Sequence, residues 1–201
     1  MSRRARPAPE AVLRFWFETA RGRWFAADPA LDAVIRRRFA PWLHAMDADP
    51  PDGDDRWLDA PGDGLALLIG LDQFPRNVWR GSNKAFALDG AALDCTLAYL
   101  DRGFDLALDA EMRPFAYMAL MHAEDPDAQE ACVALCETRL GPDSGTARHA
   151  RAHRDVIARF GRFPHRNAAL GRESTAEEIA FLESGGYAPG AKRPARSADR
   201  A

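Results

Sequence analysis

The segment at residues 65–77 reads LALLIGLDQFPRN. Its apolar side chains recur at helical spacing, and Leu65, Leu68 and Ile69 form one stripe that ends at Asp72. The pattern therefore predicts a buried α-helix with a carboxylate at the end of its apolar face. Strand patterns are scarce elsewhere, since Val occurs five times and Ile four times, with no alternating run of β-branched residues.

A second segment repeats the end of the first. Residues 71–77 read LDQFPRN and residues 161–167 read GRFPHRN, so Phe-Pro stands before Arg-Asn in both. Proline disfavours helical geometry at the residue before it and cannot donate a backbone hydrogen bond. We therefore expect a helix to end at each Phe-Pro, and each turn to present an arginine and an amide. Two such turns are suited to converge on one anionic ligand.

The chain is long enough for one domain with a sizeable core, because 47% of its 201 residues are hydrophobic. We expect residues 10–186 to form that domain, and residues 1–9 and 187–201 to be disordered tails. A net charge of −3 provides no positive field for a nucleic-acid backbone or an anionic membrane, so we expect neither as a partner. No apolar stretch approaches the length of a membrane span.

The cysteines and the N-terminal segment both indicate the cellular compartment. Cys132 and Cys136 lie one helical turn apart, which is a poor geometry for a disulfide, and the total of three cysteines is odd. The N-terminal segment lacks the apolar run of a secretory signal peptide, because Arg14 and Glu18 interrupt it. We therefore expect reduced core thiols in a cytoplasmic protein.

Helix start and stop patterns are dense along the chain. Asp-Pro at 28–29 and at 125–126 places an N-cap before proline at the first helical position. Thr175 and Glu178 form a capping-box pattern. Short connections between seven or eight helices predict an all-α fold of stacked antiparallel helix hairpins. The expected helices span residues 10–20, 29–46, 65–74, 89–102, 114–122, 126–140, 146–160 and 175–184.

Ionisable side chains stand at the ends of apolar helical stripes. Asp72 and His122 each end such a stripe, and His153 shares its face with apolar residues. A buried ionisable group is costly unless it is hydrogen-bonded or paired, so we expect these three to join one polar network. Glu124 and the two Arg-Asn turns supply the partners that such a network needs.

Three interpretations of this network stay open. The first is a pocket for a small anionic molecule or a peptide carboxylate, because the donors outnumber Asp72 and Glu124 as acceptors. The second is an enzyme of hydrolase or lyase type, in which His122 or His153 acts as general base and a carboxylate orients it. The third is an interaction scaffold whose network only fixes helix register. The predicted ligand-binding donors are Arg76, Asn77, His165, Arg166 and Asn167.

Metal and cofactor patterns are weak. His149 and His153 lie four residues apart on a predicted helix, a spacing that lets two imidazoles reach one ion. The glutamate of a zinc-protease motif does not accompany them, and no glycine-rich nucleotide loop occurs. We therefore expect neither a bound metal nor a cofactor.

Several motifs together carry a family resemblance over residues 10–186. They are Trp16-Phe17, residues 71–77, His122-Ala123-Glu124, His153-Arg154-Asp155, residues 160–167 and Leu170-Gly171-Arg172. In these motifs the chain resembles the bacterial domain of unknown function 924 family. The resemblance implies an all-α superhelix like that of tetratricopeptide repeats.

The chain departs from that family at two positions. The family usually has His-Ser-Glu where this chain has His122-Ala123-Glu124, so a hydroxyl nucleophile is lacking at Ala123. Gly70 stands where a bulkier apolar residue is usual, which predicts closer helix packing or a weaker helix at that point.

Overall fold

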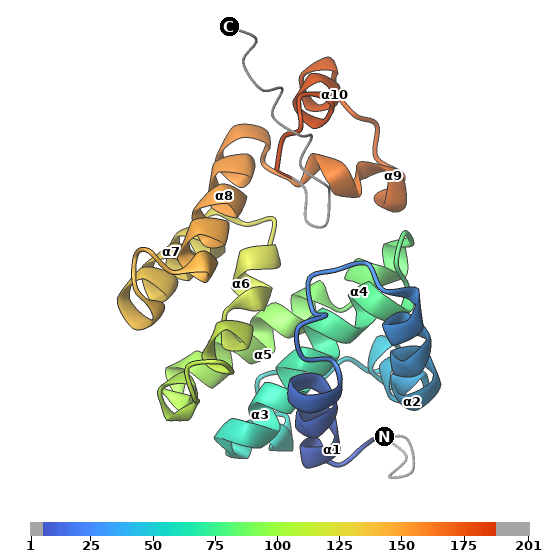
Figure 1. Cartoon of the computed structure of the whole chain (residues 1–201), viewed down its shortest axis with the longest axis vertical. Helices are drawn as coiled ribbons and strands as arrows, with labels where there is room; N and C mark the ends of the chain where they lie inside the picture. The colour runs from blue at the N-terminus through green and yellow to red at the C-terminus, as the bar shows by residue number, and fades with distance from the viewer. Residues whose placement is uncertain (1–5, 188–201) are drawn as a thin grey trace, which may run out of the picture.

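The computed structural model describes residues 6–187, and every regular element in that range is helical (Figure 1). The described residues therefore confirm the predicted all-α class. The main helices, in line with the seven or eight expected, are α1 at Pro9–Arg14, α2 at Pro29–Ala48, α3 at Pro61–Leu68, α5 at Asp89–Asp101, α7 at Pro126–Leu140, α8 at Gly145–Phe160 and α10 at Ala176–Glu183. Shorter helices are α4 at Phe74–Val78, α6 at Met118–His122 and α9 at Asn167–Leu170.

The predicted caps define the helix ends. Asp28 accepts hydrogen bonds from the backbone N–H groups of residues 30 and 31, and Asp125 accepts one from residue 128. Thr175 and Glu178 form the expected capping box at the start of α10. Gly103 stands two residues after the end of α5 and has a φ of +68°, a conformation that glycine adopts without strain.

The first Phe-Pro motif corrects one prediction. The helix does not end at Phe74, because α3 continues through a π-helical turn at Ile69–Gln73 directly into α4. Phe74 is helical, with φ −62° and ψ −38°, and its N–H donates to the carbonyl of Ile69, five residues earlier. The wider π turn accommodates Pro75 where a regular α-helix would bring its ring against a carbonyl.

The second motif follows the prediction. Helix α8 ends at Phe160, and Gly161 takes a φ of +68°. Phe163 is extended, with φ −90° and ψ 107°, and Pro164 begins a short 3₁₀ turn that ends at Arg166. The two similar sequences therefore adopt different backbone paths.

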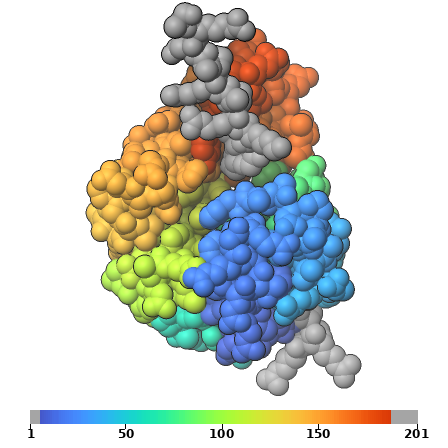
Figure 2. Space-filling view, in the orientation of Figure 1, coloured from blue at the N-terminus to red at the C-terminus, as the bar shows by residue number. Residues whose placement is uncertain are grey.

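One large hydrophobic core joins α1–α7 and the start of α8, and a smaller cluster around Val156, Ile157 and Phe163 joins the end of α8 to α10. In Figure 2 the red C-terminal helices lie above the blue N-terminal ones, and the orange helices lie at the upper left. In the large core, a Cβ built on Gly70 would lie 2.1 Å from Cη2 of Trp42. The glycine thus permits the closer packing that the sequence predicted.

The structure also bears on the predictions for the two chain ends and for the cysteines. Residues 1–5 and 188–201, which include most of the two predicted tails, lie outside the described residues. Arg6, within the predicted N-terminal tail, pairs with Asp55. All three cysteines are buried and free, as expected. Among the described residues, none of the helices has the length and apolar character needed to cross a bilayer.

Candidate functional site

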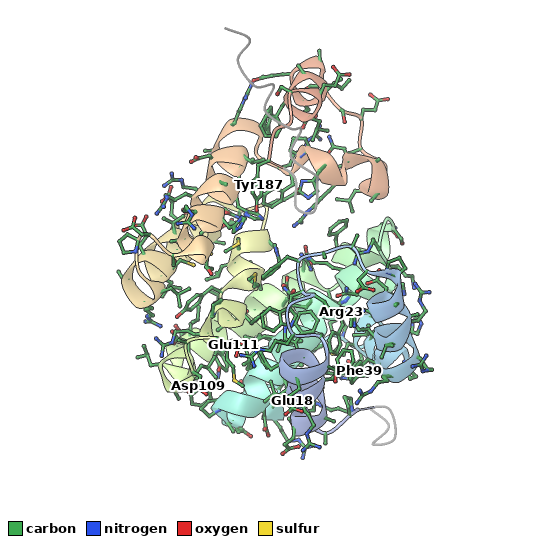
Figure 3. All side chains as sticks on the ribbon, in the orientation of Figure 1. Glu18, Arg23, Phe39, Asp109, Glu111 and Tyr187 are labelled. Carbon is green, nitrogen blue, oxygen red and sulfur yellow. The ribbon has the colours of Figure 1, made fainter. Side chains whose placement is uncertain are left out.

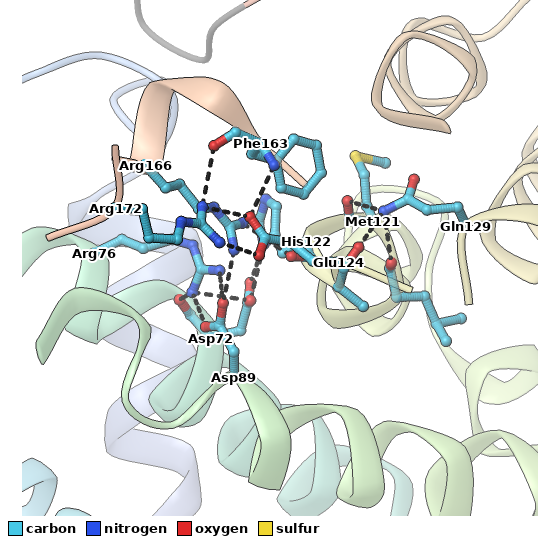
Figure 4. Close-up of polar contacts among 12 residues, drawn as sticks. Asp72, Arg76, Asp89, Met121, His122, Glu124, Gln129, Phe163, Arg166 and Arg172 are labelled. Atoms are coloured by element: carbon cyan, nitrogen blue, oxygen red, sulfur yellow. Dashed lines mark hydrogen bonds and ion pairs between the residues drawn. The ribbon is translucent and has the colours of Figure 1, made fainter. Parts of the chain in front are cut away.

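Asp72 lies in the π-helical turn between α3 and α4 and is only 2% exposed. Its carboxylate contacts Nδ1 of His122 at 2.8 and 3.0 Å and Nη1 of Arg76 at 3.1 Å (Figure 4). It also accepts a hydrogen bond from Nε2 of Gln73 at 2.5 Å. Burial favours the protonated acid, but the Arg76 guanidinium and His122 outweigh it and hold the pKa of Asp72 well below its usual range. The side chain is therefore a buried carboxylate.

His122 stands at the end of α6 and faces Asp72. Because an ionised carboxylate only accepts hydrogen bonds, Nδ1 of His122 carries the proton and Nε2 is the acceptor. Burial lowers the pKa of His122, with Arg76 and Arg166 acting in the same direction against the opposing effect of Asp72. The imidazole is therefore neutral, with a fixed tautomer.

A cavity of about 540 Å³ opens beside His122. The apolar part of its lining includes Trp24, Phe25, Met118 and Met121. The polar part includes Gln73, Arg76 and Asn77 of the first motif and Arg80, which follows the motif. The lining also includes three histidines and one tyrosine, which are His122, His149, His153 and Tyr187.

His153 joins this cavity from α8 and is only 3% exposed. Its Nδ1 lies 2.8 Å from the carbonyl oxygen of His149, so Nδ1 donates and Nε2 is an acceptor without a partner among the described residues. Burial, and then the neighbouring His122, lower the pKa of His153 to about 3. The ring centroid of Tyr187, which is labelled in Figure 3, lies 4.7 Å from that of His153.

The second motif lies behind this cavity. Arg166 is 6% exposed and lies between the rings of Phe86 and Phe163. Its guanidinium donates to Asp89 at 3.2 Å and to the carbonyl of His122 at 2.9 Å (Figure 4). Burial lowers the pKa of Arg166 to about 10. Arg166 is therefore a buried part of the network and does not line the cavity.

The two arginines converge, as the motif predicted, but on a carboxylate of the chain itself. Arg76 contacts both oxygens of Asp89 at 3.0 Å, and Arg166 contacts one of them. Asp32 likewise binds Asn77 at 2.8 Å and Arg80 at 2.9 and 3.0 Å. Asp89 and Asp32 are therefore additional acceptors, and the excess of hydrogen-bond donors over acceptors is smaller than the sequence predicted.

The other predicted residues, Glu124, His165 and Asn167, lie outside the cavity lining. Glu124 makes a bidentate pair with Arg172 at 2.6 and 2.9 Å and accepts from the backbone N–H of residue 163. Asn167 donates to Ser174 and to Glu178. Burial lowers the pKa of His165 to about 4. The structure therefore places Arg76 and Asn77 of the predicted donors at the cavity, and His165, Arg166 and Asn167 behind it.

Four residues of this site were missed by the sequence analysis. Asp32 and Asp89 each stand in the first turn of a helix, where an acidic residue is expected for the helix dipole alone. Arg80 lies outside the motif, and Arg172 was noted only within a family motif. The described residues contain no group of three or more His, Cys, Asp or Glu side chains arranged to hold a metal ion.

Comparison with known proteins gives a family. Residues 12–186 match the model of a family described as a bacterial protein of unknown function, DUF924. The chain belongs to this family. A solved structure of a protein of unknown function from Agrobacterium tumefaciens is similar to it, with 37% sequence identity and a TM-score of 0.80. That similarity covers 88% of this chain and 97% of the other. A search of curated proteins gives no match.

Proposed function

We propose that this DUF924 protein binds a small organic anion in the cavity beside His122. The observation that carries the proposal is the charge of the lining. Arg76 and Arg80 both line the cavity, and the described residues that line it include no carboxylate. The aspartates that pair with these arginines lie behind them, so a carboxylate or phosphate of a ligand adds a second acceptor for guanidinium groups that are already oriented.

The remaining lining favours an organic anion over a bare inorganic ion. Trp24, Phe25, Met118 and Met121 offer an apolar surface to a carbon skeleton. A volume of about 540 Å³ lies within the range of ligand sites, which is roughly 300–1,000 Å³. A free acid or the terminal carboxylate of a short peptide both suit this combination of charge and shape.

Paired ligands test the proposal. We would titrate the protein with 3-phenylpropionate and with 3-phenylpropanamide, which share their shape and differ in charge, by isothermal titration calorimetry. The account predicts that the carboxylate binds at least tenfold more tightly than the amide. Equal affinities, or no binding of any member of a panel of aliphatic and aromatic carboxylates, would overturn the proposal.

Acid–base catalysis is a second candidate function, supported by the contact between Asp72 and His122. A carboxylate that fixes the Nδ1–H tautomer leaves Nε2 free to accept a proton, as in a general base. The test is ¹H NMR of a panel of organic acids and their esters incubated with wild type and with His122→Gln. Turnover that the variant loses supports catalysis, and a panel left unchanged by wild type contradicts it.

The cellular compartment is part of the same proposal. Cys95, Cys132 and Cys136 are free thiols buried in the core, which suits the reducing conditions of the cytoplasm. Cell fractionation tests this location.

A further inference from the structure

His122 presents a hydrogen-bond acceptor to the cavity. Its Nδ1 is fixed as a donor to Asp72, at 2.8 Å, so Nε2 holds a lone pair. Nε2 makes no hydrogen bond within residues 6–187. It is also not among the buried polar atoms of that range that lack a partner, so it is accessible from the cavity. A ligand atom that meets this nitrogen must therefore donate.

A second acceptor lies next to the first. The ring centroids of His122 and His153 are 5.9 Å apart, and Nδ1 of His153 is also fixed as a donor, to the carbonyl of His149. Nε2 of His153 is buried and unpartnered among the described residues. Because that nitrogen has almost no accessible surface, Nε2 of His122 is the acceptor of the pair that a ligand in the cavity can reach.

The charge of the surroundings decides which kind of donor suits this place. Arg76 and Arg166 both act on His122 electrostatically, and Arg76 and Arg80 line the same cavity. A ligand ammonium group would be repelled by these guanidinium groups, whereas a neutral hydroxyl donates without that cost. The favoured donor is therefore an O–H group.

We infer that the ligand of this cavity is a hydroxy acid, whose anionic group binds at Arg76 and Arg80 and whose hydroxyl donates to Nε2 of His122. The inference rests on the proposed function, because it assigns the ligand class of the same cavity. It adds a chemical group that the positive lining alone does not require.

Ligand pairs that differ only in the hydroxyl test the inference on the wild-type chain. We would compare lactate with propionate, malate with succinate, and 3-phenyllactate with 3-phenylpropionate by calorimetry. One neutral hydrogen bond predicts that the hydroxylated member of a binding pair has an affinity roughly fivefold to tenfold higher. The O-methyl ether of 3-phenyllactate accepts but does not donate, so it should lose this advantage, and the amine in phenylalanine should not restore it.

Two variants locate the acceptor. His122→Phe keeps an aromatic ring but removes Nε2, and the advantage of 3-phenyllactate over 3-phenylpropionate should vanish. His165→Phe, outside the cavity lining, is the matched control and should keep the advantage. Binding of carboxylates with no preference for the hydroxyl overturns this inference and leaves the proposed function intact. An ether that binds as tightly as the alcohol also overturns it, whether or not His122→Phe folds. If no carboxylate of the panel binds, both proposals fail.

Discussion

The segments at 71–77 and 161–167 share Phe-Pro and Arg-Asn but differ in backbone path and in role. The first lies within a continuous helical run, and its Arg76 and Asn77 line a cavity. The second follows a helix end, and its Arg166 and Asn167 are buried behind that cavity. Both arginines reach the same carboxylate, that of Asp89. One motif thus faces the cavity and the other supports it.

This difference shows that a short motif fixes which side chains are present but does not determine how deeply they are buried or what they contact. Arg166 lies between two phenylalanine rings, which exclude water from it. Arg76 also contacts a buried carboxylate, yet it keeps one side on the cavity. Long-range packing therefore decides which guanidinium a ligand can reach.

Removal of Asp89 should have the largest effect, because this carboxylate joins the two motifs. Asp89→Ala leaves Arg166 buried with only a carbonyl as acceptor, and we expect a loss of about 3 kcal/mol in the free energy of unfolding. Chemical denaturation measures it. Asp94→Ala removes an exposed carboxylate from the same helix and should cost less than about 0.5 kcal/mol. Equal losses in the two variants would show that the motifs are not joined through Asp89.

Gly70, just before the first motif, and Gly161, at the start of the second, should differ in their response to alanine. Gly70→Ala drives a methyl group into the buried ring of Trp42, and we expect a loss of about 2–3 kcal/mol. Gly161→Ala meets open space but retains a positive φ, which costs about 1 kcal/mol. Thermal and chemical unfolding measure which of the two variants loses more stability. A larger loss at Gly161 would contradict the close packing of the π-helical turn on α2.

Acid should destabilise the fold through the histidines next to the second motif. Burial lowers the pKa of His153 to about 3 and that of His165 to about 4, from ordinary values near 6.5. The unfolded chain then binds more protons than the folded one between pH 6.5 and these values, so stability is complete above pH 6.5 and falls as the pH decreases. For His153 the loss at pH 5 is on the order of 2 kcal/mol.

The pH dependence has a direct control in a variant. His153→Gln removes the titrating group, so its stability should fall less steeply between pH 6.5 and pH 5 than that of wild type. Unfolding by urea at several pH values measures both slopes. Identical slopes would show that His153 is not held neutral by burial.

Much of the fold follows from local sequence patterns. The caps at Asp28, Asp125 and Thr175 are formed by neighbours in sequence, and the apolar stripes alone identify the helices. The course of residues 69–75 could not be predicted in this way. A π-helical turn permits Pro75 within the run, and its formation depends on packing around it.

The candidate site was only partly predictable for a related reason. The polar ends of the apolar stripes correctly brought Asp72 and His122 together. Asp32 and Asp89 were not recognised as partners, because they lie 45 residues from Asn77 and 77 residues from Arg166. Pairs at such separations leave no local pattern in one sequence.

The most direct test of the division between cavity lining and supporting network uses two matched arginines. Arg80 pairs with Asp32 at the cavity, and Arg162 pairs with Glu178 behind it, each through two hydrogen bonds to a mostly buried carboxylate. Arg80→Gln and Arg162→Gln should each cost about 1–2 kcal/mol in stability, because each replaces two charge-assisted hydrogen bonds to a mostly buried carboxylate by the weaker bond of a neutral amide. The measurement is calorimetric titration of each folded variant with 3-phenylpropionate. The account predicts that Arg80→Gln weakens binding about tenfold and that Arg162→Gln leaves it unchanged, whereas equal weakening in both, or in neither, would contradict it.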